Sequence, residues 1–303
     1  MESKKISNRL QTAYIRRYEL TDGKEAGLKV IELNNGIIRV LLNESKALDV
    51  MQLWYKGLNM SFVSKNGFIF RELPFEQRFE GGMVYTCGLD SLGERDGFEP
   101  HGSFHTNPAQ VYSVCQDDEK LEIKAVVEDT VISGKSLTLS RRITVPVGSG
   151  TLRVEDILLN SGTKTEDYCL LYHINLGYPM LDEGVLVNVQ ADSVIPRTDY
   201  AAKNMHNRTV FAPVKDNEEE YCFFIKDAGE NITVINEKIN TKLTLTYSKQ
   251  TLPNFVQWNS PATQEYALGL EPATSFLDDG FTYKQIEPGQ SIPFFVNLSF
   301  EEI

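Results

Sequence analysis

Short β-type segments separated by turn residues run through most of this chain, and they constrain its fold more than any other feature. Residues 28–43, "LKVIELNNGIIRVLLN", place two alternating segments around Asn35-Gly36, a strong hairpin signal. Residues 136–160 repeat the pattern around a turn at 148–150. Further alternating runs rich in Val, Ile and Thr occupy residues 121–130, 230–239 and 241–249. These runs predict an all-β, mainly antiparallel protein.

Helical periodicity is weak throughout, and only a few short helices are expected. The best helix candidate, around Ser7 to Tyr18, is short and peripheral. No Gly/Ser-rich or Pro-rich linker and no repeat of fixed period divides the chain. We therefore expect a single domain over residues 1–303, built as two sheets packed face to face, with residues 1–28 as a peripheral N-terminal segment.

The charge balance narrows the classes of partner. The 303 residues include 30 basic and 42 acidic side chains, a net charge of −12. Such a surface repels nucleic acid and anionic membranes. The N-terminus lacks an apolar signal segment and no run of eighteen apolar residues occurs, which indicates a cytoplasmic protein. Its cysteines, expected to be reduced, are Cys87, Cys115, Cys169 and Cys222.

Two of the four histidines lie in the loop-like segment "HGSFHTNP". His101 and His105 are four residues apart, a spacing that would place both on one face of a helix. Gly102 and the Asn107-Pro108 ending argue against a helix there. Two histidines in such a segment are as often structural or surface residues as functional ones.

A third histidine lies in the apolar segment "LLYHINLGYPML". In a strand, His173 and Asn175 share one face, and Tyr172 and Ile174 share the other. A lone histidine in a buried strand is more often a satisfied core residue. The Gly177-Tyr178-Pro179 sequence ends the strand soon after, which favours a functional position near its end.

Glu271 ends the apolar run of "EYALGLEPAT". A glutamate there is either solvated at a strand end or buried, and burial is costly unless the carboxyl is paired or reactive. A carboxylate and an imidazole at strand ends are what general acid–base chemistry requires. Trp258 would add a flat aromatic face and Arg78 a fork of donors, and both suit a sugar ring.

Several of these segments together resemble the aldose 1-epimerase (galactose mutarotase) superfamily, in a mutarotase-related branch of mostly unassigned substrate. The resemblance runs from about Gly36 to the C-terminus, and the family fold is a large antiparallel β-supersandwich. The segments that carry it are "ALDVMQLWYKG", "EGGMVYTCGLD", "HGSFHTNPA", "LLYHINLGYPMLDEG", "PNFVQW" and "LGLEPAT".

The resemblance implies a role for each matching residue. His173 would be the acid, Glu271 the base, and His101 a second histidine that orients the substrate. Arg78 is the best match to the family arginine, with Arg71 as an alternative.

The chain also departs from the family pattern. The family aspartate that grips sugar hydroxyls has no clear match, and Gln257 or Asp90 is the expected substitute. His105 would support the site, contact the sugar or pack structurally, and Cys87 would be a small buried residue. Asn175 completes the expected substrate-binding set, which is His101, Arg78, His105, Asn175, Asp90, Gln257 and Trp258. The insert "GERDGFEP" leaves the substrate open.

Three functions are compatible with these residues. The favoured one is a cofactor-independent aldose 1-epimerase acting on a monosaccharide or a derivative, as a monomer or homodimer. The second is a sugar-binding protein of the same fold without catalysis. The third, a distant alternative, is a metal-dependent sugar isomerase with a ligand set of His101, His105, His173 and Glu271.

Overall fold

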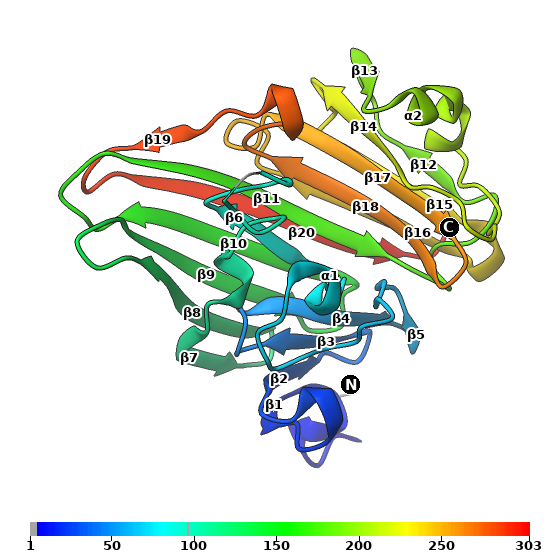
Figure 1. Ribbon diagram of the computed structural model, residues 1–303. Helices are drawn as coiled ribbons and strands as arrows, with labels where there is room; N and C mark the ends of the chain where they lie inside the picture. The colour runs from blue at the N-terminus through cyan, green and yellow to red at the C-terminus, as the bar shows by residue number, and fades with distance from the viewer. Residues whose placement is uncertain (1–4, 96) are drawn as a thin grey trace.

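The computed structural model describes residues 5–95 and 97–303, and within this part every pairing between named strands is antiparallel (Figure 1). The described strands form sheets of five, eight and seven strands. The all-β prediction is confirmed, although the strands divide into three sheets rather than the expected two. Organisation as a single domain stays a prediction.

The five-stranded sheet contains the first predicted hairpin. Its strands, in sheet order, are β1 (Tyr14–Glu19), β2 (Lys29–Asn34), β3 (Ile38–Asn43), β4 (Asp49–Tyr55) and β5 (Leu58–Asn59). In the turn between β2 and β3, the Asn35 side-chain oxygen accepts hydrogen bonds from the backbone N–H groups of Ile37 and Ile38. Gly36 has a φ of 90°, a conformation that glycine adopts without strain.

The eight-stranded sheet contains the longest hairpins. Its strands, in sheet order, are β12 (Leu186–Asn188), β15 (Asn231–Asn236), β16 (Thr241–Tyr247), β20 (Ser291–Glu301), β10 (Thr151–Asn160), β9 (Ser136–Pro146), β8 (Lys120–Thr130) and β7 (Ala109–Gln116). The predicted pairing of β9 with β10 around the turn at 148–150 is confirmed.

The seven-stranded sheet carries the candidate site. Along its main path lie β13 (Ser193–Pro196), β14 (Tyr221–Lys226), β17 (Asn254–Ala262), β18 (Glu265–Ala273), β11 (Glu166–Leu176) and β19 (Lys284–Ile286), and β6 (Tyr85–Leu89) pairs with β11. The central strands are buried along most of their length. Polar side chains on them are therefore removed from water, which makes their partners decisive.

The helices are short, as expected, but the predicted N-terminal one is wrong. The two α-helices of the described chain are α1 (Phe75–Arg78) and α2 (Asp199–Lys203). Between Ser7 and Tyr18 the helical part is a single 3-10 turn, Arg9–Gln11, and Tyr14 begins β1. The segment "YIRRYE" is rich in aromatic and β-branched residues and pairs with β2, so tertiary pairing overrides its weak helical pattern.

Apolar side chains from all three sheets pack into one large cluster. Leu33 of the five-stranded sheet, Leu121 of the eight-stranded sheet and Leu270 of the seven-stranded sheet all belong to it. In the described part of the chain, no helix is long and apolar enough to cross a membrane. The four cysteines are free thiols, and Cys87 is buried as predicted.

Candidate active site

Two neighbouring strands bring His173 and Glu271 together. β11 pairs with β18 such that Ile174 lies opposite Leu270, which places His173 and Glu271 side by side on one face of the sheet. His173 Nε2 lies 3.3 Å from Glu271 Oε1, and the two residues are 3% and 2% exposed. The two atoms are close but do not form a hydrogen bond, and Oε1 has no other hydrogen-bond partner in the described structure. The contact leaves both groups available to a ligand.

Gly269, two residues before Glu271 on the same face of β18, makes room for this pair. A Cβ at Gly269 would lie 2.5 Å from Glu271 Oε1, 2.9 Å from His173 Cε1 and 3.1 Å from Trp258 Cβ. The first two separations are shorter than side chains tolerate. Sequence reasoning missed this residue, although a glycine inside a strand is itself a signal that another group approaches closely.

Burial pushes both groups toward their neutral forms. It raises the pKa of Glu271 well above the usual range, and the negative charge of Glu220 adds to the rise while Arg197 opposes it. It lowers the pKa of His173 well below the usual range, with His101 acting in the same direction and Asn175 against it. Both shifts favour the neutral forms of the pair, a protonated Glu271 carboxyl group and an uncharged His173 imidazole.

His101 faces the same space from the loop after β6. Its Nδ1 donates a hydrogen bond to the Leu92 carbonyl at 2.7 Å, which leaves Nε2 as an acceptor on the neutral ring. Burial lowers the pKa of His101 to about 4, so the ring is neutral at physiological pH. The rings of His101 and His173 are perpendicular, with centroids 5.4 Å apart.

A cavity of about 370 Å³ opens over these residues. That volume is at the small end of the range for ligand pockets, about 300–1,000 Å³. Its aromatic and aliphatic lining comes from Phe62, Phe75, Phe79, Trp258 and Leu277. Trp258, predicted from the sequence, lies edge-on to His173 with ring centroids 5.5 Å apart, and the Phe79 ring is tilted against His173 with centroids 5.7 Å apart.

Most of the charged lining was not predicted from the sequence. Besides Glu271 and the two histidines, the ionisable side chains other than Cys222 are Lys65, Glu76, Arg197, Glu220 and Glu265. Glu220, the last glutamate of the acidic run in residues 215–221, is exposed, accepts a 2.8 Å hydrogen bond from Trp258 Nε1 and lines the cavity. No local pattern marks Arg197, which reaches the cavity from the end of β13.

The two arginines expected from the sequence do not line this cavity. Arg78 is buried beside it, where one guanidinium nitrogen donates to the Tyr85 hydroxyl at 3.2 Å and another lies 3.5 Å from Glu99. Arg71 is exposed in a different surface depression. Arg197 is therefore the arginine that lines the cavity, and Arg78 is buried next to it without lining it.

Three other predicted substrate contacts hold neighbouring backbone or side chains instead. Asp90 accepts hydrogen bonds from the backbone N–H and hydroxyl of Ser103 and so fixes the His101 loop. Gln257 donates to the Arg208 carbonyl on the face of β17 opposite to Trp258. The Asn175 amide donates to the carbonyls of Gly82 and His173. None of the three lines the cavity.

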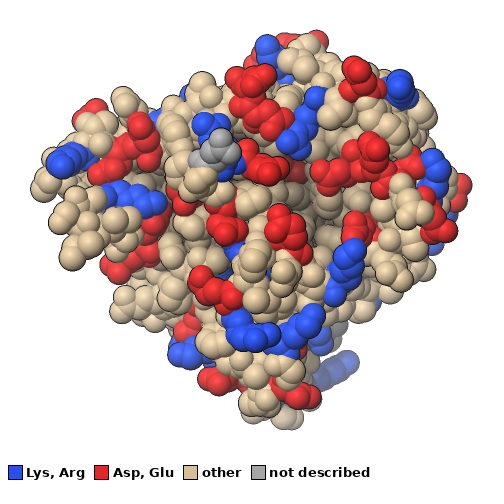
Figure 2. Space-filling view, in the orientation of Figure 1, with Lys and Arg blue, Asp and Glu red and all other residues tan. Residues whose placement is uncertain are grey.

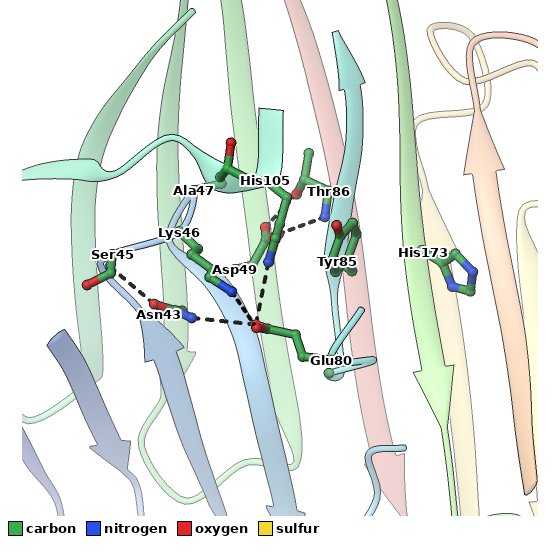
Figure 3. A network of polar contacts seen from close by, with 12 residues as sticks. Asn43, Ser45, Lys46, Ala47, Asp49, Glu80, Tyr85, Thr86, His105 and His173 are labelled. Atoms are coloured by element: carbon green, nitrogen blue, oxygen red, sulfur yellow. Dashed lines mark hydrogen bonds and ion pairs between the residues drawn. The ribbon is translucent and has the colours of Figure 1, made fainter. Parts of the chain in front are cut away.

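His105 lies in a separate buried network (Figure 3). Its Nδ1 is 2.6 Å from Asp49 Oδ2, and its Nε2 is 3.5 Å from Glu80 Oε1. Its ring stacks on Tyr85 with centroids 3.8 Å apart, and Tyr85 pairs across the sheet with His173. His105 is therefore placed behind Tyr85, away from the cavity.

This placement bears on the metal-dependent alternative. The described residues contain no group of three or more His, Cys, Asp or Glu side chains placed to hold a metal ion. His105, one of the four ligands that alternative would use, is engaged with Asp49 and Glu80 on the other side of Tyr85. The four side chains do not converge on one point.

Solved structures share the fold of this chain. A Klebsiella pneumoniae protein provisionally named an aldose 1-epimerase superposes with a TM-score of 0.84 at 21% identity, covering 99% of this chain and 86% of that one. A galactose mutarotase-like protein from Clostridium acetobutylicum gives 0.72 at 15% identity, with 97% and 100% covered. Galactose 1-epimerase from Lactobacillus acidophilus gives 0.67 at 14%, with 96% and 99% covered. The fold is galactose mutarotase-like.

Sequence comparison places the chain in a family whose function is not assigned. No curated protein matches it at the sequence level. One family model matches residues 25–287, which is well over half of the chain and includes every residue of the cavity. The chain therefore belongs to the family described as DUF4432, a domain of unknown function.

Proposed function

We propose that the protein is a cofactor-independent aldose 1-epimerase that interconverts the anomers of an aldose. The observation that carries this proposal is the His173–Glu271 pair: two buried groups 3.3 Å apart, open to a cavity, with pKa values moved in opposite directions. Titratable pairs whose environments separate their proton affinities are suited to acid–base roles. The names of structures with the same fold point to the same chemistry.

The first step opens the sugar ring. With a cyclic aldose bound, the Glu271 carboxylate removes the proton of the anomeric hydroxyl, and protonated His173 gives a proton to the ring oxygen. The bond between C1 and the ring oxygen breaks as C1 becomes an aldehyde carbonyl. Glu271 then carries the proton and His173 is neutral, which is the pair of forms that burial favours.

The second step closes the ring on the other face of the carbonyl. After rotation about the C1–C2 bond, His173 takes the proton of the attacking hydroxyl and Glu271 returns its proton to the carbonyl oxygen. Each turnover therefore begins and ends with one proton on the pair. A cyclic sugar that aligns the two groups would let that proton pass from Glu271 to His173 across their 3.3 Å separation.

The other cavity residues hold the ring in place. His101 offers Nε2 as an acceptor for a sugar hydroxyl, and Trp258 and Phe79 offer aromatic surface beside His173. Such fixation matters because misplacement of reacting groups by about 1 Å can reduce a rate about 100-fold. A cytoplasmic location and the absence of a cofactor remain predictions.

The test is anomer-exchange NMR on a panel of aldoses with the wild type and three variants. Glu271→Gln and His173→Asn should each slow exchange about 10²- to 10⁴-fold, the range that general acid–base catalysis supplies. The double variant should lose far less than the product of the two losses, because the residues act as one unit. Exchange by the wild type should survive exhaustive dialysis against a chelator.

Two variants control for non-specific effects. His206→Asn changes the chain's remaining histidine, which is exposed, and Glu219→Gln changes a carboxylate beside Glu220 that does not line the cavity. Both should exchange like the wild type. Near wild-type exchange in Glu271→Gln, with sugar still bound, would replace this proposal with the sugar-binding protein. Exchange restored only by added metal would favour the isomerase.

A further inference from the structure

The cations that line the cavity are already neutralised by protein carboxylates. Arg197 Nε lies 2.6 Å from one Asp278 oxygen, and its Nη2 donates to the other at 2.9 Å. Lys65 forms an ion pair with Glu265. Lys65 and Glu265 both line the cavity, and Asp278 directly follows the lining residue Leu277, so each lining cation already has a carboxylate partner.

Two lining carboxylates remain without a cationic partner among the described residues. Glu220 accepts only the neutral Trp258 N–H, and Glu76, on α1, forms no ion pair. They come from different elements, since Glu220 precedes β14 and Glu76 lies in α1. Figure 2 shows acidic side chains gathered around the hollow of this face.

A ligand is indicated independently of these charges. Glu271 is 2% exposed, lines the cavity, and has an Oε1 atom without a hydrogen-bond partner. Buried polar atoms of this kind are rare in folded proteins unless a ligand or water completes them. Glu220 and Glu76, the two carboxylates without a cationic partner, therefore line the same cavity as Glu271, whose buried Oε1 atom has no hydrogen-bond partner in the described structure.

We propose that the preferred substrate is an amino sugar, an aldose carrying an ammonium group, and that anionic aldoses are disfavoured. The inference rests on the proposed epimerase function and names its substrate class. An ammonium group would supply the cation that Glu220 and Glu76 lack. A phosphate or carboxylate would meet both charges with the nearby cations already engaged.

The expected preference is modest because both carboxylates are solvent-exposed. Exposed ion pairs each contribute a small factor, so two should favour an amino sugar over the neutral sugar by about 2- to 30-fold at low salt. Because exposed charges are screened by ions, the preference should shrink as ionic strength rises.

The experiment compares matched sugars by calorimetry and by anomer-exchange NMR. The pairs are glucosamine with glucose, galactosamine with galactose and mannosamine with mannose, and glucose 6-phosphate is the anionic probe. At about pH 6.5 an amine of ordinary pKa near 8 is protonated. In at least one pair the amino sugar should bind about 2- to 30-fold tighter, and glucose 6-phosphate should bind more weakly than glucose.

Variants assign the preference to the named carboxylates. Glu220→Gln and Glu76→Gln should each reduce the ratio of the two dissociation constants, and Glu219→Gln should leave it unchanged. Equal affinities within every pair, with exchange observed, would overturn this inference and leave the epimerase proposal standing. Amino-sugar binding without exchange of any aldose would overturn the epimerase proposal alone. Binding of no aldose at all would overturn both.

Discussion

Two buried histidine–carboxylate contacts lie on either side of Tyr85 and behave in opposite ways. His105 Nδ1 is 2.6 Å from Asp49, and His173 Nε2 is 3.3 Å from Glu271. All four side chains are almost fully buried. The first contact belongs to a network rich in partners, and the second has almost none.

The network around Asp49 compensates each charge that it buries. Arg141 donates to Asp49, to Asp156 and to the Ala47 carbonyl. Burial alone would raise the pKa of Asp49, but the hydrogen bond from His105 and the charge of Arg141 outweigh it and hold that pKa below its ordinary value. Glu80 follows the same logic with His105 and Lys46. These carboxylates stay ionised.

The cavity pair lacks that compensation. Among the described residues no lysine or arginine forms an ion pair with Glu271, and its pKa rises because burial outweighs the opposing charge of Arg197. Buried carboxylates with several partners, such as Asp49 and Glu80, therefore favour the charged form, whereas burial without such partners favours the protonated form of Glu271. The same residue types at similar depth thus have different uses, and the number of hydrogen-bond partners distinguishes them.

The alternation of β11 separates the two centres. The Tyr172 hydroxyl donates to Asp156 at 2.6 Å and so joins the network, whereas the next residue, His173, faces Glu271 in the cavity. A strand presents successive side chains to opposite faces. One strand therefore supplies one residue to the network and the next to the cavity.

The largest expected effect comes from breaking the network. Arg141→Met should lower the free energy of unfolding by about 3–5 kcal/mol, because it leaves Asp49 and Asp156 buried without their cation. Arg142→Met is the matched control, since the neighbouring arginine forms an exposed pair with Glu155 worth about 0–1 kcal/mol. Urea unfolding at pH 7 measures both. Equal losses would mean that the network does not stabilise the fold.

Replacing His105 and replacing His173 should have opposite effects, the first on stability and the second on activity. His105→Asn removes a hydrogen bond to the Asp49 carboxylate and should cost about 1.5–3 kcal/mol of stability, with anomer exchange largely retained. His173→Asn should abolish most exchange at little cost in stability. Urea unfolding and anomer-exchange NMR on both variants check this. A well-folded His105→Asn protein without exchange would show that the network takes part in the chemistry.

The smallest effect is a gain in stability with a defined pH dependence. The pKa of Glu271 is raised by folding, so its contribution is fully present below the ordinary value near 4.5 and is lost as pH rises toward the folded pKa. Glu271→Gln removes this loss. The variant should therefore gain stability relative to the wild type as pH rises from 5 to 8, by up to about 1.4 kcal/mol for each pH unit below the folded pKa. A constant difference across that range would contradict the raised pKa.

The sequence by itself determined the alternating strands, the hairpin turns and the choice of His173 and Glu271 as the candidate acid–base pair. Asn35-Gly36 and the turn at 148–150 mark local geometry, and local geometry is encoded by adjacent residues. His173 and Glu271 could be singled out because each is a polar residue in an otherwise apolar strand segment, where burial is costly. Trp258 was singled out as a flat aromatic surface, and His101 was noted in its loop segment and given a role through the family resemblance.

Only the tertiary structure decided which charged groups surround that pair. Arg197 comes from a segment with no distinctive pattern and Glu220 from an acidic run that does not mark a site, and the packing of β13 and β14 beside β17 brings them to the cavity. Arg78, Asp90, Gln257 and His105 had suitable chemistry but lie behind or beside the cavity. The physical reason is that strand alternation and sheet pairing, set by contacts between distant segments, determine the face on which a side chain lies.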